Sequence, residues 1–317
     1  MNFDSVDFVS MDQDKPEIFF YGRVNGQNYN LVKYNYHSNE ISAKANKLPG
    51  GGTSIEMRLY STENGQELFF PQGTKLDVYD AGDLNYKYEL APENIGGYDD
   101  FAYLGNNIFC FTTSKAIFTY KRTNANLEFI DKKEHFSTHF GNGNYHLIPL
   151  KGNEILVGYF QEPQSFKFSI SSTGKISNQQ LVNIPIKSRW KKKTLYSPER
   201  DYVVNLLENR LYSTNSFNLE DSFEKPYYPS GISRNGNLIL GSSNNPDDYS
   251  GNESTFERKI QLYNLSTGKV TTVESKGFPH LLFENYLGQI ISISSGFYRQ
   301  NLENSTPKPD IFVEVIQ

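Results

Sequence analysis

A short unit recurs seven times along this chain of 317 residues: a polar tight turn, followed at once by an apolar segment with the length of a β-strand. Glycine and asparagine dominate the turns because they adopt the backbone angles that tight turns require. A unit repeated at a nearly constant period favours a repeat architecture over a fold with one irregular core. The seven copies cover residues 15–18, 64–68, 105–108, 152–155, 199–202, 235–238 and 287–290.

A second unit follows downstream in each copy: a strand that ends at an anchor residue, usually aromatic, and then a polar hairpin. The hairpin that starts at Tyr34 aligns without gaps with the one that starts at Tyr263, and residues 169–176 share Ser-Thr-Gly-Lys with the latter. The anchors recur roughly every 35 to 51 residues, with a mean of about 44. They are Tyr34, Tyr79, Tyr120, Ser169, Tyr212, Tyr263 and Tyr298.

Composition supports an all-β fold. Phe (23) and Tyr (22) bring the aromatic content to 15%, and Gly (24) and Pro (14) supply many turns. Strand formers mixed with turn formers favour many short strands, and long apolar stripes of helical period are missing. Each period therefore holds four strands, here called a, b, c and d, with the tight turn between a and b and the hairpin between c and d.

The seven turn-plus-strand copies and the Tyr-Asn-x-Ser-Thr-Gly-Lys hairpins resemble those of the WD40/YVTN-like superfamily of seven-bladed β-propellers, from about residue 6 to residue 315. The resemblance implies a single β-propeller domain over residues 1–317, with seven four-stranded blades. It indicates no specific family, because the Trp-Asp and Gly-His pairs of WD40 repeats are absent. A six-bladed propeller and a pair of β-sandwiches are the alternatives.

Charge and cysteine content exclude several classes of protein. The net charge of −5 argues against a nucleic-acid-binding protein, which needs a broad surplus of Lys and Arg on its binding face. Cys110 is the single cysteine, so neither an intrachain disulfide nor an all-cysteine metal site can form. Its apolar neighbours predict a buried strand position. We expect no cofactor.

The N-terminal residues contain no basic region followed by an apolar stretch, and no run of eighteen apolar residues occurs anywhere. We therefore expect no membrane span and a cytoplasmic protein. An exported or periplasmic protein whose signal had been trimmed would have the same sequence. A monomer is expected.

The resemblance also implies that the d-to-a and b-to-c connections share one face, commonly the face that binds ligands. The long loops rich in glycine, proline and aromatic residues fall on these connections, a mixture suited to stacking on a polar ligand and hydrogen-bonding it. The alternative interpretation is that these loops only connect the strands of a propeller and bind no ligand. The predicted binding residues are Tyr98, Asp99, His139, Tyr145, Trp190, Tyr227, Tyr228, Phe278 and His280.

Three further clusters are candidates for an anion-binding or metal site. The basic run 187–193, which contains Trp190, could bind an anionic partner or be a solvated loop. His135 and His139 lie about 13 Å apart if the segment is extended, too far to share one metal ion. Asp247 and its polar neighbours offer oxygen ligands but match no EF-hand pattern. No metal site is predicted.

No linear motif of a nucleophile, a zinc protease or a phosphate-binding loop occurs in the chain. The favoured function is a non-catalytic propeller that presents its aromatic and polar loop face to a protein or to a small polar or carbohydrate ligand. The alternative is a propeller enzyme, a hydrolase or lyase that acts on a carbohydrate or peptide in the central pocket. Asp99, Asp100 and Glu162 are then the candidate acid or base groups.

Overall fold

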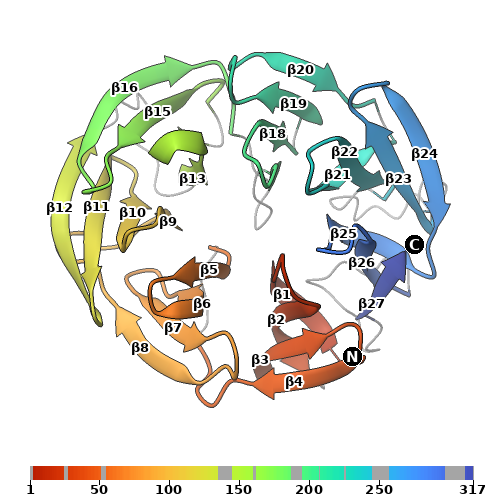
Figure 1. The fold of residues 1–317 in the computed structure, drawn as a ribbon, viewed down its shortest axis with the longest axis horizontal. Helices are drawn as coiled ribbons and strands as arrows, with labels where there is room; N and C mark the ends of the chain where they lie inside the picture. The colour runs from red at the N-terminus through yellow and green to blue at the C-terminus, as the bar shows by residue number, and fades with distance from the viewer. Residues whose placement is uncertain are drawn as a thin grey trace. The chain divides into compact units, whose positions relative to one another are not determined.

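The computed structural model describes residues 3–24, 28–50, 55–134, 145–159, 162–186, 195–206, 208–224, 226–244, 257–296 and 311–316. In these residues the chain forms seven sheets, each built from strands consecutive in sequence (Figure 1). All pairs of neighbouring strands whose register is known are antiparallel. Among the described residues, the one helical element is the 3-10 turn η1, Lys151–Asn153.

The chain divides into two compact units. The first comprises Met1–Leu48, Leu195–Leu211 and Asp221–Gln317, and the second comprises Pro49–Thr194 and Tyr212–Glu220. The second unit holds three complete sheets. Their strands are β5 (Arg58–Thr62), β6 (Gly65–Pro71), β7 (Leu76–Asp80) and β8 (Tyr86–Leu90); β9 (Asp100–Tyr103), β10 (Ile108–Thr112), β11 (Ala116–Thr123) and β12 (Asn126–Glu134); and β13 (Tyr145–Pro149), β14 (Glu154–Tyr159), β15 (Ser165–Ile170) and β16 (Ile176–Val182).

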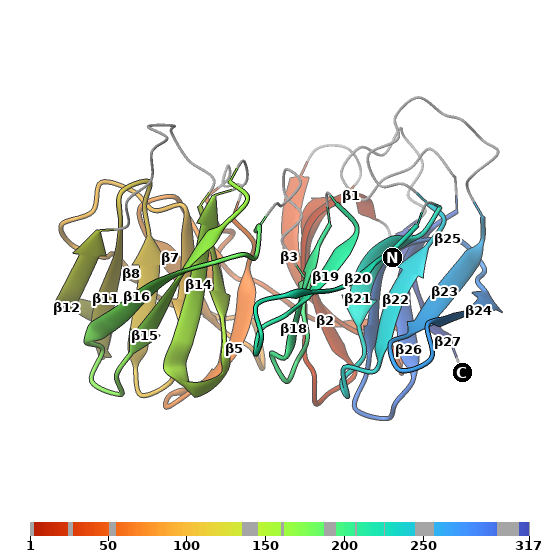
Figure 2. The same cartoon turned by 90° about the horizontal axis from the view of Figure 1, so that it is seen from above.

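The first unit holds the first, sixth and seventh sheets, and Figure 2 shows strands of the sixth sheet side by side. The fifth sheet, β17 to β20, has strands in both units. The remaining strands are β1 (Phe3–Met11), β2 (Glu17–Val24), β3 (Asn28–Asn35) and β4 (Glu40–Lys44); β17 (Leu195–Tyr196), β18 (Tyr202–Asn205), β19 (Arg210–Ser213) and β20 (Leu219–Ser222); β21 (Tyr228–Ile232), β22 (Leu238–Ser242), β23 (Lys259–Asn264) and β24 (Lys269–Glu274); and β25 (Phe278–Glu284), β26 (Ile290–Ser295) and β27 (Ile311–Ile316).

The predicted fold class is confirmed: the chain is an all-β propeller with seven blades. Six sheets have four strands, and the seventh has three within the described residues. Seven sheets exclude the six-bladed alternative. The expectation of one domain over residues 1–317 stays a prediction.

The recurring tight turns place the second strand of every blade. Glycine takes a positive φ in several of them, for example 96° at Gly65, 87° at Gly105 and 72° at Gly236, where a side chain would strain the backbone. The residue after each turn then enters strand b, as the repeat predicts. All seven expected positions are confirmed: Ile18, Leu68, Ile108, Ile155, Tyr202, Leu238 and Ile290.

The anchors mark the third strands. Six of them lie in β3, β7, β11, β15, β19 and β23, and Tyr298 lies outside the described residues. Beside Tyr34, the Asn35 side chain accepts the backbone N–H groups two and three residues ahead at 2.9 and 3.0 Å. Asn264 accepts the equivalent pair at 3.0 Å each. These Asx turns explain why the Tyr-Asn pair recurs at the hairpins.

The described hydrophobic cores lie between neighbouring sheets. In the second unit, one core joins the β5–β8 and β9–β12 sheets, and another, containing the fully buried Cys110, joins the β9–β12 and β13–β16 sheets. In the first unit, Val6 of β1 and Ile311 of β27 share a core. The first and last strands therefore meet at one blade junction.

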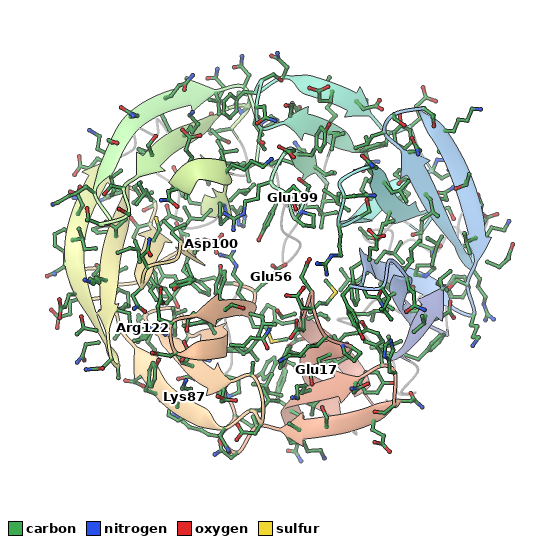
Figure 3. The ribbon with its side chains drawn as sticks, in the orientation of Figure 1. Glu17, Glu56, Lys87, Asp100, Arg122 and Glu199 are labelled. Carbon is green, nitrogen blue, oxygen red and sulfur yellow. The ribbon has the colours of Figure 1, made fainter. Side chains whose placement is uncertain are left out.

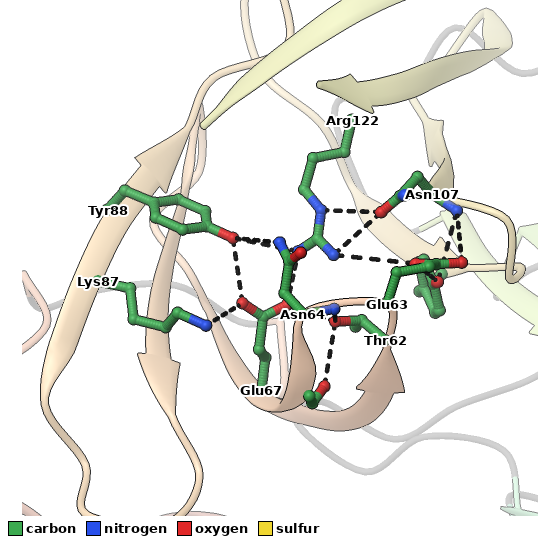
Figure 4. Close-up of polar contacts among 10 residues, drawn as sticks. Thr62, Glu63, Asn64, Glu67, Lys87, Tyr88, Asn107 and Arg122 are labelled. Atoms are coloured by element: carbon green, nitrogen blue, oxygen red, sulfur yellow. Dashed lines mark hydrogen bonds and ion pairs between the residues drawn. The ribbon is translucent and has the colours of Figure 1, made fainter. Parts of the chain in front are cut away.

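A buried ionic network also joins the β5–β8 and β9–β12 sheets (Figure 4). The Glu67 carboxylate accepts hydrogen bonds from Lys87 at 2.7 Å, Tyr88 at 3.0 Å, Arg122 at 2.5 Å and Thr62 at 2.7 Å. The Glu67 and Arg122 side chains are 0% and 1% exposed. Removing either charge would leave the other buried without a partner, which would destabilise the fold.

Within the part of the chain that the structure describes, no helix is both long enough and apolar enough to cross a membrane.

Candidate functional site

Hydrogen bonds in the second unit bring a d-to-a and a b-to-c connection together at one end of their sheets. Tyr98 precedes β9, and Gly73 and Lys75 connect β6 to β7. The Tyr98 backbone N–H donates to the Gly73 carbonyl at 3.1 Å, and its hydroxyl donates to the Lys75 carbonyl at 2.7 Å. The face assignment that the resemblance implies therefore holds at this blade.

Three charged or titratable side chains lie side by side at this end, each near the start of the first strand of its blade: Arg58 on β5, Asp100 on β9 and His146 on β13. The Arg58 Nη2 atom lies 2.8 Å from Oδ1 of Asp100 and 3.1 Å from Oδ2. The His146 Nδ1 atom lies 4.0 Å from Oδ2 of the same carboxylate. We call Arg58, Asp100 and His146 the first-strand row.

Asp100, labelled in Figure 3, is the centre of this row. Besides Arg58, its carboxylate accepts the backbone N–H groups of Phe101 and Leu147, each at 2.8 Å. The guanidinium carbon of Arg58 lies 5.0 Å from the centre of the Phe101 ring. Asp100 thus holds Arg58 against an aromatic face and ties β9 to β13, because its oxygens bind groups from three strands.

The four tyrosines predicted to bind a ligand, Tyr98, Tyr145, Tyr227 and Tyr228, are all buried. Tyr227 donates its hydroxyl to the Ile239 carbonyl at 2.7 Å. Burial raises the pKa of both Tyr98 and Tyr227 well above the ordinary value, so their hydroxyls remain donors. Their role as ligand contacts stays a prediction.

Other predicted binding residues are partly exposed. Asp99 is half-buried before β9, and its backbone N–H donates to the Thr112 carbonyl at 2.8 Å. In the first unit, Phe278 and His280 are half-buried near the start of β25. The guanidinium carbon of Arg258 lies 5.2 Å from the Phe278 ring centre. Positions near the start of a first strand thus offer aromatic, acidic and imidazole groups.

His139 and Trp190 lie outside the described residues, as does the whole basic run 187–193. Their membership of the binding face stays a prediction. No group of three or more His, Cys, Asp or Glu side chains in the described ranges could hold a metal ion.

Arg58 was missed by the sequence reasoning. It stands alone on a short strand, 42 residues before its partner Asp100, and no spacing rule relates the two. An isolated arginine within 55–60, an otherwise largely apolar segment, was the only available signal. His146 is not among the binding residues that the sequence predicts.

No protein-family model matches the chain, and no curated protein matches it. Solved structures do resemble it. Kuenenia stuttgartiensis hydrazine synthase superposes with a TM-score of 0.59 at 8% identity, over 100% of this chain and 96% of that one. Streptogramin B lyase gives 0.60 at 11% identity, over 99% and 95%. Saccharomyces cerevisiae Sqt1 gives 0.53 at 14% identity, over 98% and 86%. These likenesses show the fold alone.

Proposed function

We propose that this chain is a non-catalytic binding propeller, and that the d-to-a end of its blades binds a partner protein or a small polar ligand such as a carbohydrate. The observation that carries the proposal is the environment of Asp100. A general acid or base must reach a proton of the substrate with a free lone pair or a proton of its own. Asp100 is instead 0% exposed and occupied by Arg58 and two backbone donors.

The surrounding groups are suited to recognition. Arg58 is fixed by Asp100 beside the Phe101 ring, and a guanidinium fixed in this way is pre-organised for planar acceptors such as carboxylates and amides. His146 is 18% exposed at the same end. Rigid placement lowers the entropy lost when a ligand binds, so a site held by hydrogen bonds binds more tightly than a loose one.

The test is the binding of ligands from arrays of peptides and oligosaccharides. His146→Ala removes an imidazole that is 18% exposed at the d-to-a end of the fourth blade, in the same unit as Arg58 and Asp100, and should weaken the affinity for a recovered ligand about three- to tenfold. Lys151→Ala is the matched control, because Lys151 is exposed in the a-to-b turn of the same blade. The proposal is contradicted if the first variant binds the ligand as tightly as the wild type and the control variant does not bind it.

The second candidate function is a hydrolase or lyase. Two of the similar structures are named as enzymes, a synthase and a lyase, which keeps this alternative worth testing. Asp99 and Glu162 are half-buried, unlike Asp100. Turnover of an array ligand that disappears in Asp99→Asn or Glu162→Gln, while the ligand still binds, would favour the enzyme.

A further inference from the structure

Within the described residues, the seventh sheet differs from the other six at its outer edge. Its strand order is β25-β26-β27, and β26 occupies one edge of β27. No described strand pairs with the other edge, whereas β24 forms the outer strand of the sixth sheet (Figure 1). An open edge presents a row of backbone donors and acceptors to which a further strand can pair.

The strand with the open edge is firmly placed. Ile311 packs in the core shared with the first sheet, and Ile316 packs in the core shared with the sixth. The Glu314 carboxylate accepts the Ser275 hydroxyl at 2.9 Å and the Lys276 backbone N–H at 2.8 Å. Since both faces of β27 are anchored, a strand added to its edge would dock on a fixed template.

The neighbouring first sheet shows what side chains would line the missing strand. Its outer strand β4 pairs Ile41 with Tyr34 and Lys44 with Val32. Tyr34 and Val32 both belong to the core shared with the seventh sheet, so Ile41 and Lys44 face that sheet as well. Ile41 is 44% exposed, and Lys44 is also exposed. No described residue forms an ion pair with Lys44.

Two four-stranded blades show which side chains a fourth strand presents to the next blade. Asp131, on the fourth strand β12, accepts the Ile176 backbone N–H of the next blade at 3.0 Å. Asp221, on the fourth strand β20, accepts the hydroxyl of Tyr263, the anchor of the next blade. The equivalent anchor in the first blade, Tyr34, donates instead to Asn39 of its own hairpin. Fourth strands thus present a carboxylate to the following blade.

We propose that the open edge of β27 is a docking site for an extended segment of a partner protein, which pairs as the fourth strand of the seventh blade. The segment carries an aspartate or glutamate toward Lys44, and β-branched or aromatic residues that cover Ile41. This surface is separate from the d-to-a end and does not depend on the proposed function. The mode is β-strand addition, in which backbone hydrogen bonds supply affinity and alternate side chains supply specificity.

The probe is a synthetic peptide with the sequence of β12, Asn126–Glu134, which is a fourth strand containing Asp131. Added to the full chain, it should slow the hydrogen exchange of the outward amides of Ile311–Ile316 at least tenfold, because pairing protects them. Its backbone N-methylated form keeps every charge and should give no protection. The peptide with lysine in place of Asp131 should bind several-fold more weakly.

Charge reversal on the protein completes the test. Lys44→Glu should weaken the peptide about fivefold, since one exposed attraction becomes a repulsion. Lys133→Glu is the matched control, an exposed lysine on the outer strand of a complete sheet, and should leave binding unchanged. Binding without protection of β27, or binding unaffected by N-methylation, overturns the proposal. So does protection of β27 that rises with protein concentration alone, which would make a second copy the occupant.

Discussion

Replacing Glu67 by glutamine tests whether the network of Figure 4 holds two blades together. The substitution keeps the shape of the side chain but removes its charge. Arg122 and Lys87 then lose the carboxylate that lies 2.5 and 2.7 Å away, and Arg122 remains almost fully buried. Removing one partner of a buried ion pair costs about 3 to 5 kcal/mol. For a domain of this size that corresponds to a melting temperature lowered by roughly 6 to 10 °C.

The stability lost in Glu67→Gln should depend on pH. Burial by itself raises the pKa of Glu67, but hydrogen bonds from Lys87, Arg122 and Thr62 outweigh it, so the pKa lies below its ordinary value. A depressed pKa contributes stability above the unfolded value, near 4.5, and that contribution disappears as the pH falls through the folded value. The wild type should therefore melt well above Glu67→Gln at pH 7, and the difference should shrink below about pH 4.

Calorimetric melting from pH 3 to pH 8 measures both effects. Lys75→Met is the control, because the Lys75 and Glu89 side chains are 38% and 49% exposed and an exposed pair contributes less than about 1 kcal/mol. Arg122→Met should cost less in the Glu67→Gln background than in the wild type, since the two residues form one network. A melting temperature of Glu67→Gln within 2 °C of the control would refute this reasoning.

Three further outcomes follow from local geometry. A Cβ at Gly231 would lie 1.9 Å from a carbonyl oxygen of β25, so Gly231→Ala should cost about 2 kcal/mol or more in thermal melts, while Gly96→Ala, with nothing within 4 Å, should be nearly neutral. Burial raises the pKa of the Cys110 thiol, which should therefore react with a disulfide reagent at pH 8 only after unfolding, and rapid labelling of the native chain would contradict its position. The hydrogen bond with Asp221 raises the pKa of Tyr263 to about 12, and ultraviolet titration of Asp221→Asn should show one tyrosine moved back toward 10.

The strand order of the blades could be predicted because its signals are local. Turn glycines such as Gly65 and Gly236 need positive φ angles, and Asx turns at Asn35 and Asn264 need only the next three residues. Each of these requirements involves only consecutive residues. The second strand of each blade was therefore located correctly without any knowledge of how the sheets pack.

The polar networks could not be predicted because they join residues of different blades. Glu67 and Arg122 are 55 residues apart, and Arg58 and Asp100 are 42 apart. Blade lengths vary, so no fixed spacing relates such partners. For the same reason the sequence did not show that four of the predicted binding tyrosines are buried, and it did not identify Arg58 beside Asp100. Exposure depends on packing between blades, which composition does not encode.

Photo-crosslinking from paired positions tests the proposed binding face most directly. A benzoylphenylalanine at position 56, in the d-to-a connection before β5, samples the proposed face, and one at position 64, in the a-to-b turn after it, samples the other end of the same strand. Each variant is irradiated with a ligand recovered from the arrays. We expect adducts from position 56 and none from position 64. Adducts from position 64 alone, or equally from both, would contradict the proposal that ligands bind at the d-to-a end.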